Sequence, residues 1–199
     1  TPLVIHNFEI YLLTVAHCCP NTATKILKLF KTITLYGRRH GFLSHDPFVN
    51  KRFHTQDSNR RFLTDEEIQR IIGKEISIPR LDLVRDIFIF SCFSGLAYID
   101  VSNLTEDNIV ELDGREWIMT RRQKTRVATN IILLDIPKRI IEKYAPVRKN
   151  GHLLPILSNQ KMNAYLKEIA DLCNIRKPLS FHMAKHREIR KYQITNRLV

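Results

Sequence analysis

One apolar stretch limits what this chain can fold into. It spans residues 87–99, about 13 positions between two aspartates, and is too short for the ~20 apolar residues that cross a bilayer. Its spacing predicts a buried helix over 83–93, which Ser94 and Gly95 would end. We therefore expect a globular core built around this helix, and no membrane span.

The composition excludes several other classes of protein. The chain has 199 residues, of which 44% are hydrophobic and 26% charged, enough apolar material for one domain or two small ones. This excludes disordered chains, collagens and small disulfide scaffolds. The four cysteines are Cys18, Cys19, Cys92 and Cys173, and their spacing fits no zinc site. No signal peptide is visible, so we expect a reduced, cytoplasmic protein that binds no metal.

The charge predicts a polyanionic partner. The formal net charge is +12, and double-stranded DNA is the first candidate. Residues 25–61 hold nine basic and two acidic side chains, whereas residues 62–114 hold four basic and eleven acidic ones. Residues 115–126 and 176–199 are further basic blocks. A charged face in contact with solvent would explain one such basic block, but three separate basic blocks favour a binding surface.

The first part of the chain predicts two helices and a linker. Residues 8–13 have helical spacing, and Asn21 and Thr22 are expected to cap a second helix with one apolar and one basic face. Residues 49–61 are polar, basic and without periodicity, which predicts a linker. The residues of the basic face that we expect to contact DNA are Lys25, Lys28, Lys31, Arg38 and Arg39.

A second domain is predicted from residue 62 onward. Thr64 stands three residues before Glu67, the spacing of a capping box that starts a helix. Residues 117–120 and 129–134 predict two strands, and residues 137–144 and 162–173 two helices. We therefore expect a mainly α protein with a small antiparallel β-sheet. The cations expected to contact DNA from the turn between the strands are Arg121, Arg122 and Arg126.

Three short motifs follow in a fixed order: SGLAYID at 94–100, RQKT at 122–125 and FHMAK at 181–185. In this order and spacing they resemble the catalytic domain of the tyrosine recombinase (phage integrase) family. The GLAYID segment is similar to a segment of the integrases of Bacteroidetes mobile elements. The resemblance covers essentially the whole chain. It implies an α+β integrase-type catalytic domain over 62–199, preceded by part of a helical core-binding (SAM-like) domain over 1–48.

The resemblance also implies a reaction and residue roles. In this family a tyrosine attacks the DNA phosphodiester, with no metal, nucleotide or other cofactor. Lys124 would protonate the leaving oxygen, His182 would hydrogen-bond a phosphate oxygen, and Asp100 would support the first phosphate-clamping arginine. Lys185 would occupy the arginine position that ends the HxxR motif. If the family resemblance is set aside, each residue also has a structural interpretation. Lys124 is then a solvated lysine, His182 is a histidine with a structural partner, and Asp100 is a salt-bridging or helix-starting residue.

The chain departs from the family pattern at several positions. Ala97 replaces the first arginine, and Lys185 keeps a charge but lacks the guanidinium fork. Losing one such donor costs about 2.7–4 kcal/mol of transition-state stabilisation. Relatives with GLAYID also lack this arginine, so Arg122 or Arg126 are candidates to reach the phosphate.

The nucleophile is a further departure. The family tyrosine lies several helical turns beyond HxxR, but only 14 residues follow Lys185. We expect the C-terminal tyrosine segment to be missing. Tyr192 is the single tyrosine after Lys185, at a distance that does not match the family position. Tyr98, Tyr144 and Tyr165 have the apolar contexts of core residues.

These observations leave two main functions open. The first is DNA binding and site-specific recombination or integration of a mobile element, by a chain that does not complete strand cleavage by itself. The alternative is a non-catalytic DNA-binding or regulatory module derived from a truncated integrase. A structural or RNA-binding helical protein is a third interpretation. Relatives assemble as tetramers on DNA by exchanging a C-terminal segment. The resemblance therefore implies a homo-oligomer on DNA, whose assembly through that segment requires the segment to be present.

Overall fold

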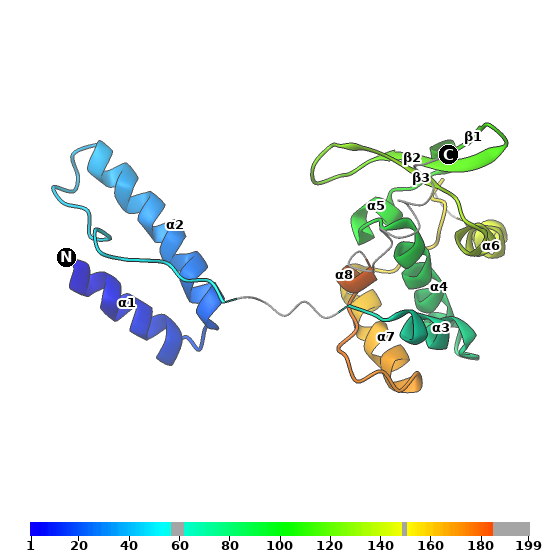
Figure 1. The fold of residues 1–199 in the computed structure, drawn as a ribbon, viewed down its shortest axis with the longest axis horizontal. Coiled ribbons are helices and arrows are strands. Elements are labelled where there is room, and N and C mark those ends of the chain that lie inside the picture. Colours follow the sequence, from blue (N-terminus) through cyan, green and yellow to red (C-terminus); the bar gives the residue numbers. More distant parts are fainter. Residues whose placement is uncertain (57–61, 149–150, 185–199) are drawn as a thin grey trace. The chain divides into compact units, whose positions relative to one another are not determined.

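The computed structural model describes residues 1–56, 62–148 and 151–184. The chain forms two compact units, Thr1–Arg60 and Arg61–Val199. Figure 1 shows the helices and strands of each. The first unit is all helical, and the second combines helices with one sheet.

The first unit is built on two helices, α1 (Pro2–Thr14) and α2 (Pro20–Arg39). Both begin at a proline, whose fixed φ and missing N–H suit the first turn of a helix. The rings of Phe8, Phe30 and Phe48 pack edge-to-face in series, with centroids 5.6 and 5.7 Å apart. The buried core residues of this unit are Ile5, Leu12, Ala23, Leu27 and Phe48.

Residues 51–56, here called the strap, pack along these two helices. Lys51 forms an ion pair with Glu9 of α1. Thr24 of α2 donates a hydrogen bond to the carbonyl of His54 at 3.1 Å. The strap is therefore fixed to the first unit, although the sequence predicts a linker here.

The start of α2 corrects the predicted cap. The N-cap residue is Cys19, and no side chain caps the helix. Asn21 instead bonds the backbone of Gln56, accepting from its N–H at 2.8 Å and donating to its carbonyl at 2.9 Å. The side chain of Asn21 therefore holds the strap and does not cap α2.

The second unit surrounds α4 (Pro79–Ser94), which contacts α3, α6, α7 and α8. Leu81, Val84 and every residue from 86 to 92 are buried. Gly95 ends the helix in the left-handed conformation, with φ 65°. The prediction of a buried helix ended at Ser94 and Gly95 is confirmed. The other helices of this unit are α3 (Asp65–Gly73), α5 (Tyr98–Ser102), α6 (Asp135–Tyr144), α7 (Asn159–Leu172) and α8 (Phe181–Ala184), with short 3₁₀ turns at Glu106–Asn108 and Ala145–Val147.

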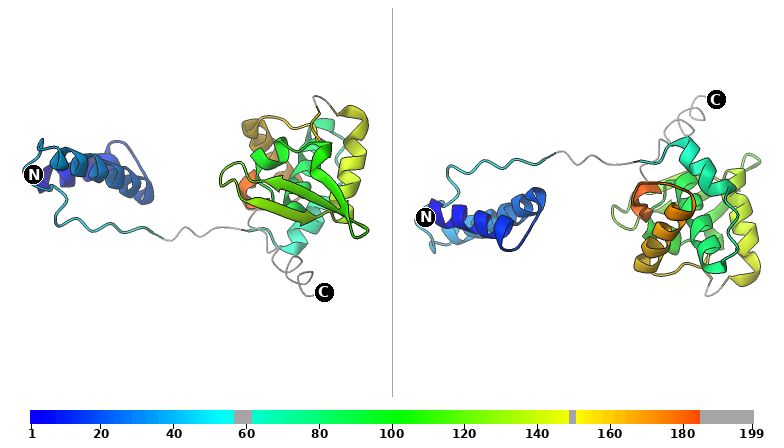
Figure 2. Two further views of the ribbon diagram at one scale, coloured as in Figure 1. Left: turned by 90° about the horizontal axis from the view of Figure 1, so that it is seen from above. Right: turned by 90° about the horizontal axis from the view of Figure 1, so that it is seen from below.

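An antiparallel sheet lies across one end of these helices (Figures 1 and 2). Its strands are β1 (Ile109–Leu112), β2 (Arg115–Arg121) and β3 (Ala128–Ile132), in the order β1-β2-β3. The β1–β2 turn is formed by Asp113 and Gly114, both at positive φ, as an Asp-Gly hairpin requires. The predicted mainly α fold with a small antiparallel sheet is confirmed, and β1 is an additional strand.

An ion cluster around the buried Asp86 joins α4 to α6. Asp86 is 7% exposed, and its carboxylate accepts hydrogen bonds from Arg85 at 2.9 Å, Lys143 at 2.6 Å and the hydroxyl of Tyr144 at 2.9 Å. Burial and the neighbouring Asp86 charge raise the pKa of Tyr144 far above its ordinary value. The hydroxyl thus stays protonated and serves as a structural donor.

The predicted capping box at the start of α3 is present. The N–H of Thr64 donates to Glu67 Oε2 at 2.8 Å, and the N–H of Glu67 donates to Thr64 Oγ1 at 3.2 Å. Lys177, which precedes α8 in the chain, donates to Glu67 Oε2 at 2.8 Å and to the carbonyl of Phe62 at 3.0 Å. One carboxylate therefore ties the beginning of the second unit to the segment that leads into α8.

Within the described ranges, no helix combines the length and the apolar character that a membrane span needs.

Candidate nucleic-acid interface

The turn between β2 and β3 carries the second motif. The N–H of Arg122 donates to Val127 O at 3.0 Å, and the N–H of Arg126 donates to Arg122 O at 2.7 Å. Arg126 takes the left-handed conformation, with φ 56°. Lys124 is exposed at the tip of this turn, so its ammonium is accessible to a large ligand.

Asp100 anchors this turn to α5. The side chain is 6% exposed, and its Oδ1 accepts a hydrogen bond from the backbone N–H of Gln123 at 2.8 Å. Gln123 directly precedes Lys124 in the chain. The buried carboxylate thus fixes the backbone from which Lys124 projects, through a contact that the sequence analysis did not anticipate.

The first and third motifs meet at one cavity. Ala97, just before α5, and His182 of α8 both line a cavity of about 490 Å³. Within it Asn163 Oδ1 accepts a hydrogen bond from the N–H of Phe181 at 2.8 Å, which satisfies a free donor at the start of α8. The other polar residues of the cavity wall are Asn159, Lys167 and Ser180.

Aromatic packing holds α8 against α5. The rings of Tyr98 and Phe181 meet edge-to-face, with centroids 5.7 Å apart and an interplanar angle of 86°. The Tyr98 hydroxyl donates to the carbonyl of Leu157 at 2.9 Å. Ala97 and His182 are brought together by these contacts, because each directly precedes or follows one of the two rings in the chain.

The other tyrosines predicted to be core residues also have structural contacts. The hydroxyl of Tyr144 bonds Asp86, and the guanidinium of Arg80 lies 4.7 Å from the ring centroid of Tyr165. Lys185 and Tyr192, the remaining candidate site residues, lie outside the described residues.

Ion pairs distinguish the cations predicted to contact DNA from a set of structural cations among the described residues. Seven are in ion pairs with carboxylates: Lys51, Arg80, Arg85, Lys138, Lys143, Arg148 and Lys177. The eight cations predicted to contact DNA have no ion-pair partner within the part of the chain that the structure describes: Lys25, Lys28, Lys31, Arg38, Arg39, Arg121, Arg122 and Arg126. Lys31 and Arg122 are half-buried and the other six are exposed. Arg122 Nε donates to Thr129 Oγ1 at 3.3 Å. The unpaired cations are thus available to a polyanion.

The sequence analysis missed Lys167 and the strap. Lys167 enters the cavity wall only because α7 packs beside α8, and nothing local in its sequence indicates this. The strap does carry a signal, since Lys51, Arg52, Phe53 and His54 combine basic and aromatic character. No group of three His, Cys, Asp or Glu side chains within the described ranges is arranged to hold a metal ion.

The sequence matches no protein-family model and no curated protein. The structure, in contrast, is similar to lambda integrase bound to DNA, with a TM-score of 0.77 and 16% identity over 98% of this chain and 72% of that one. It is also similar to the Tn1549 transposon integrase in complex with circular intermediate DNA, with a TM-score of 0.71 and 10% identity over 96% of this chain and 73% of that one. A third match is the XerH site-specific recombinase bound to palindromic difH substrate, with a TM-score of 0.68 and 14% identity over 95% of this chain and 62% of that one.

The chain has the fold of these integrases and recombinases. This confirms the fold class that the three motifs imply.

Proposed function

We propose that this protein binds double-stranded DNA and acts in site-specific recombination or integration of a mobile element, of the kind found in Bacteroidetes. The observation that carries the proposal is that none of the eight cations predicted to contact DNA has an ion-pair partner among the described residues, on a fold whose neighbours were solved with DNA. Such cations neutralise phosphates and release counterions, which drives binding regardless of DNA sequence. DNA in the cytoplasm would be the partner.

The cavity and the hairpin turn supply proposed catalytic positions. Lys124 would protonate the leaving oxygen, and His182 would donate a hydrogen bond to the phosphate at the cavity that it shares with Ala97. Asp100 would act as a positioning residue, because it holds the backbone next to Lys124. Lys185 would be a second cation at the phosphate.

We further propose that the chain binds DNA without completing strand cleavage. The methyl group of Ala97 offers no donor to a phosphate in the cavity. Loss of one such donor typically lowers the rate by about 10²–10³. The same observation favours the second candidate function, a DNA-binding or regulatory module without catalysis.

A gel experiment tests both parts. The protein is incubated with a pool of nicked duplexes that trap covalent intermediates, and each sample is run natively and after denaturation in SDS. We expect a native shift that disappears in SDS. An SDS-resistant adduct would contradict the lack of cleavage and make Tyr192→Phe the first variant to examine. No native shift would contradict DNA binding itself.

We also propose a homo-oligomer on DNA. Lambda integrase was solved as a dimer bound to a core site and as a tetramer bound to a Holliday junction. Mass measurement of this protein with and without a duplex tests the proposal. A single copy per duplex at saturating protein would contradict it.

A further inference from the structure

We infer that Phe53 positions Lys28 and Lys31 of α2 for contact with DNA phosphates, and that the strap is thereby part of the DNA interface. This inference rests on the proposed DNA binding. It assigns a role to a segment that the sequence marks only as a linker.

Contacts along the strap hold Phe53 in place. The ion pair between Lys51 and Glu9 fixes one end, and the two hydrogen bonds between Asn21 and Gln56 fix the other. Between them, the ring of Phe53 packs on that of Phe48, with centroids 6.1 Å apart. Because Phe48 is only 1% exposed, Phe53 rests on the core of the first unit.

Two lysines of α2 lie over this ring. The Nζ atoms of Lys28 and Lys31 lie 5.9 and 5.7 Å from the centroid of Phe53, within the ~6 Å range of cation–π attraction. Neither lysine has an acidic partner among the described residues. The ring attracts each ammonium without neutralising its charge, so its N–H donors remain available to phosphate oxygens.

Holding the lysines over a ring lowers the entropic cost of binding. A free lysine side chain has many rotamers and loses most of them when its ammonium contacts a phosphate. Phe53 removes part of that freedom before DNA arrives. The partner that fits this surface is a nucleic acid backbone, because two neighbouring ammonium groups over one ring match repeated phosphates better than a single carboxylate.

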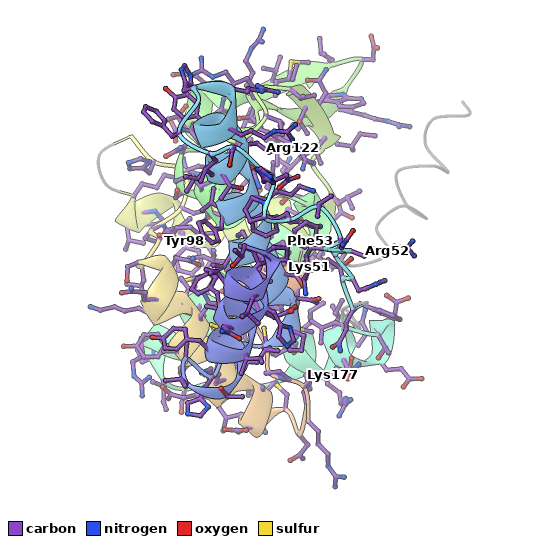
Figure 3. The ribbon with its side chains drawn as sticks, turned by 90° about the vertical axis from the view of Figure 1, so that its left-hand side faces the viewer. Lys51, Arg52, Phe53, Tyr98, Arg122 and Lys177 are labelled. Carbon is purple, nitrogen blue, oxygen red and sulfur yellow. The ribbon has the colours of Figure 1, made fainter. Side chains whose placement is uncertain are left out.

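The strap adds one cation of its own. Arg52 is exposed and points away from α1 and α2 (Figure 3), whereas the neighbouring Lys51 is paired with Glu9. Arg52 directly precedes Phe53 in the chain. The strap thus adds Arg52 to the exposed cations of the first unit.

The central test is Phe53→Leu, which keeps an apolar side chain on Phe48 but removes the aromatic face. We expect affinity for a mixed-sequence duplex to fall about 2- to 5-fold. The slope of log affinity against log salt should stay the same, because the number of cations is unchanged. In a Lys28→Ala/Lys31→Ala background, Phe53→Leu should have no further effect.

The matched control is Phe42→Leu, since Phe42 is 79% exposed in the same unit and contacts His40 rather than a lysine. It should bind as the parent does, and circular dichroism should show all variants folded. Parental affinity in Phe53→Leu, or an equal loss in the double-alanine background, would overturn the inference. If Phe53→Leu does not fold, Phe53→Trp decides: tighter binding than the parent supports the inference, and equal or weaker binding overturns it. A parent that binds no DNA would instead refute the proposed function.

Discussion

Asp100 joins two elements that meet in space, α5 and the β2–β3 turn. Its carboxylate is buried and accepts the N–H of Gln123. In Asp100→Ala this N–H no longer has its acceptor, a change that typically costs about 1–3 kcal/mol. We expect a corresponding drop in the free energy of unfolding and faster hydrogen exchange of the Gln123 amide.

Asp107→Ala is the matched control, because Asp107 is exposed. Unchanged exchange of the Gln123 amide in Asp100→Ala would contradict the anchoring role.

Glu67 makes the stability of the second unit depend on pH. Burial raises the pKa of this carboxyl, but the hydrogen bonds from Lys177 and Thr64 outweigh burial and hold the pKa below its ordinary value. Because this pKa is lower in the folded state than in the unfolded state, the ionised carboxylate stabilises the fold at pH values above the unfolded-state pKa, about 4.3. This stabilisation disappears as the pH falls through the folded-state pKa.

Glu67→Gln tests this linkage. We expect it to be less stable than the parent at pH 7 by about 1 kcal/mol, and this difference to shrink below about pH 4. Urea unfolding at pH 7 and pH 3 measures it, with exposed Glu66→Gln as the control. A difference that is the same at both pH values would argue against the linkage.

At the scale of elements, α4 and α6 share an ion cluster around the buried Asp86. Asp86→Ala removes the acceptor of the Tyr144 hydroxyl and leaves Arg85 and Lys143 with Asp82 as their carboxylate partner. A buried hydroxyl that loses its acceptor typically costs about 1–3 kcal/mol. We expect the free energy of unfolding of Asp86→Ala to fall by that much in urea, while Glu142→Ala on the exposed side of α6 changes it little. A decrease below about 1 kcal/mol would show that the cluster contributes no net stability.

Elements with strong local signals were predictable, and those that depend on distant contacts were not. The apolar run of α4 and the Thr64–Glu67 spacing each determine structure within a few residues. The predicted cap at Asn21 is wrong because that amide bonds Gln56, 35 positions away in sequence. β1 was overlooked although Asp113 and Gly114 form a recognisable hairpin turn.

For the whole molecule, the candidate site depends on tertiary packing more than on motifs. The resemblance indicated Ala97, Lys124 and His182 together, and the structure brings Ala97 and His182 to one cavity. The hydrogen bond from Gln123 to Asp100 and the place of Lys167 depend on how the turn meets α5 and how α7 meets α8. Such contacts leave no periodic signal in the sequence.

The salt dependence of DNA binding tests the central claim most directly. Affinity for a mixed-sequence duplex is measured at several salt concentrations for the parent and for the variant with alanine at Lys28, Lys31, Arg38 and Arg39. The control is Arg80→Ala/Lys138→Ala, which removes cations that are paired with Glu168 and Glu116.

The account predicts that the slope of log affinity against log salt becomes shallower in the four-alanine variant, by about 0.9 for each phosphate that the protein no longer neutralises. The control should keep the parental slope. A four-alanine variant with the parental slope and affinity would contradict the claim that these unpaired cations form the DNA interface.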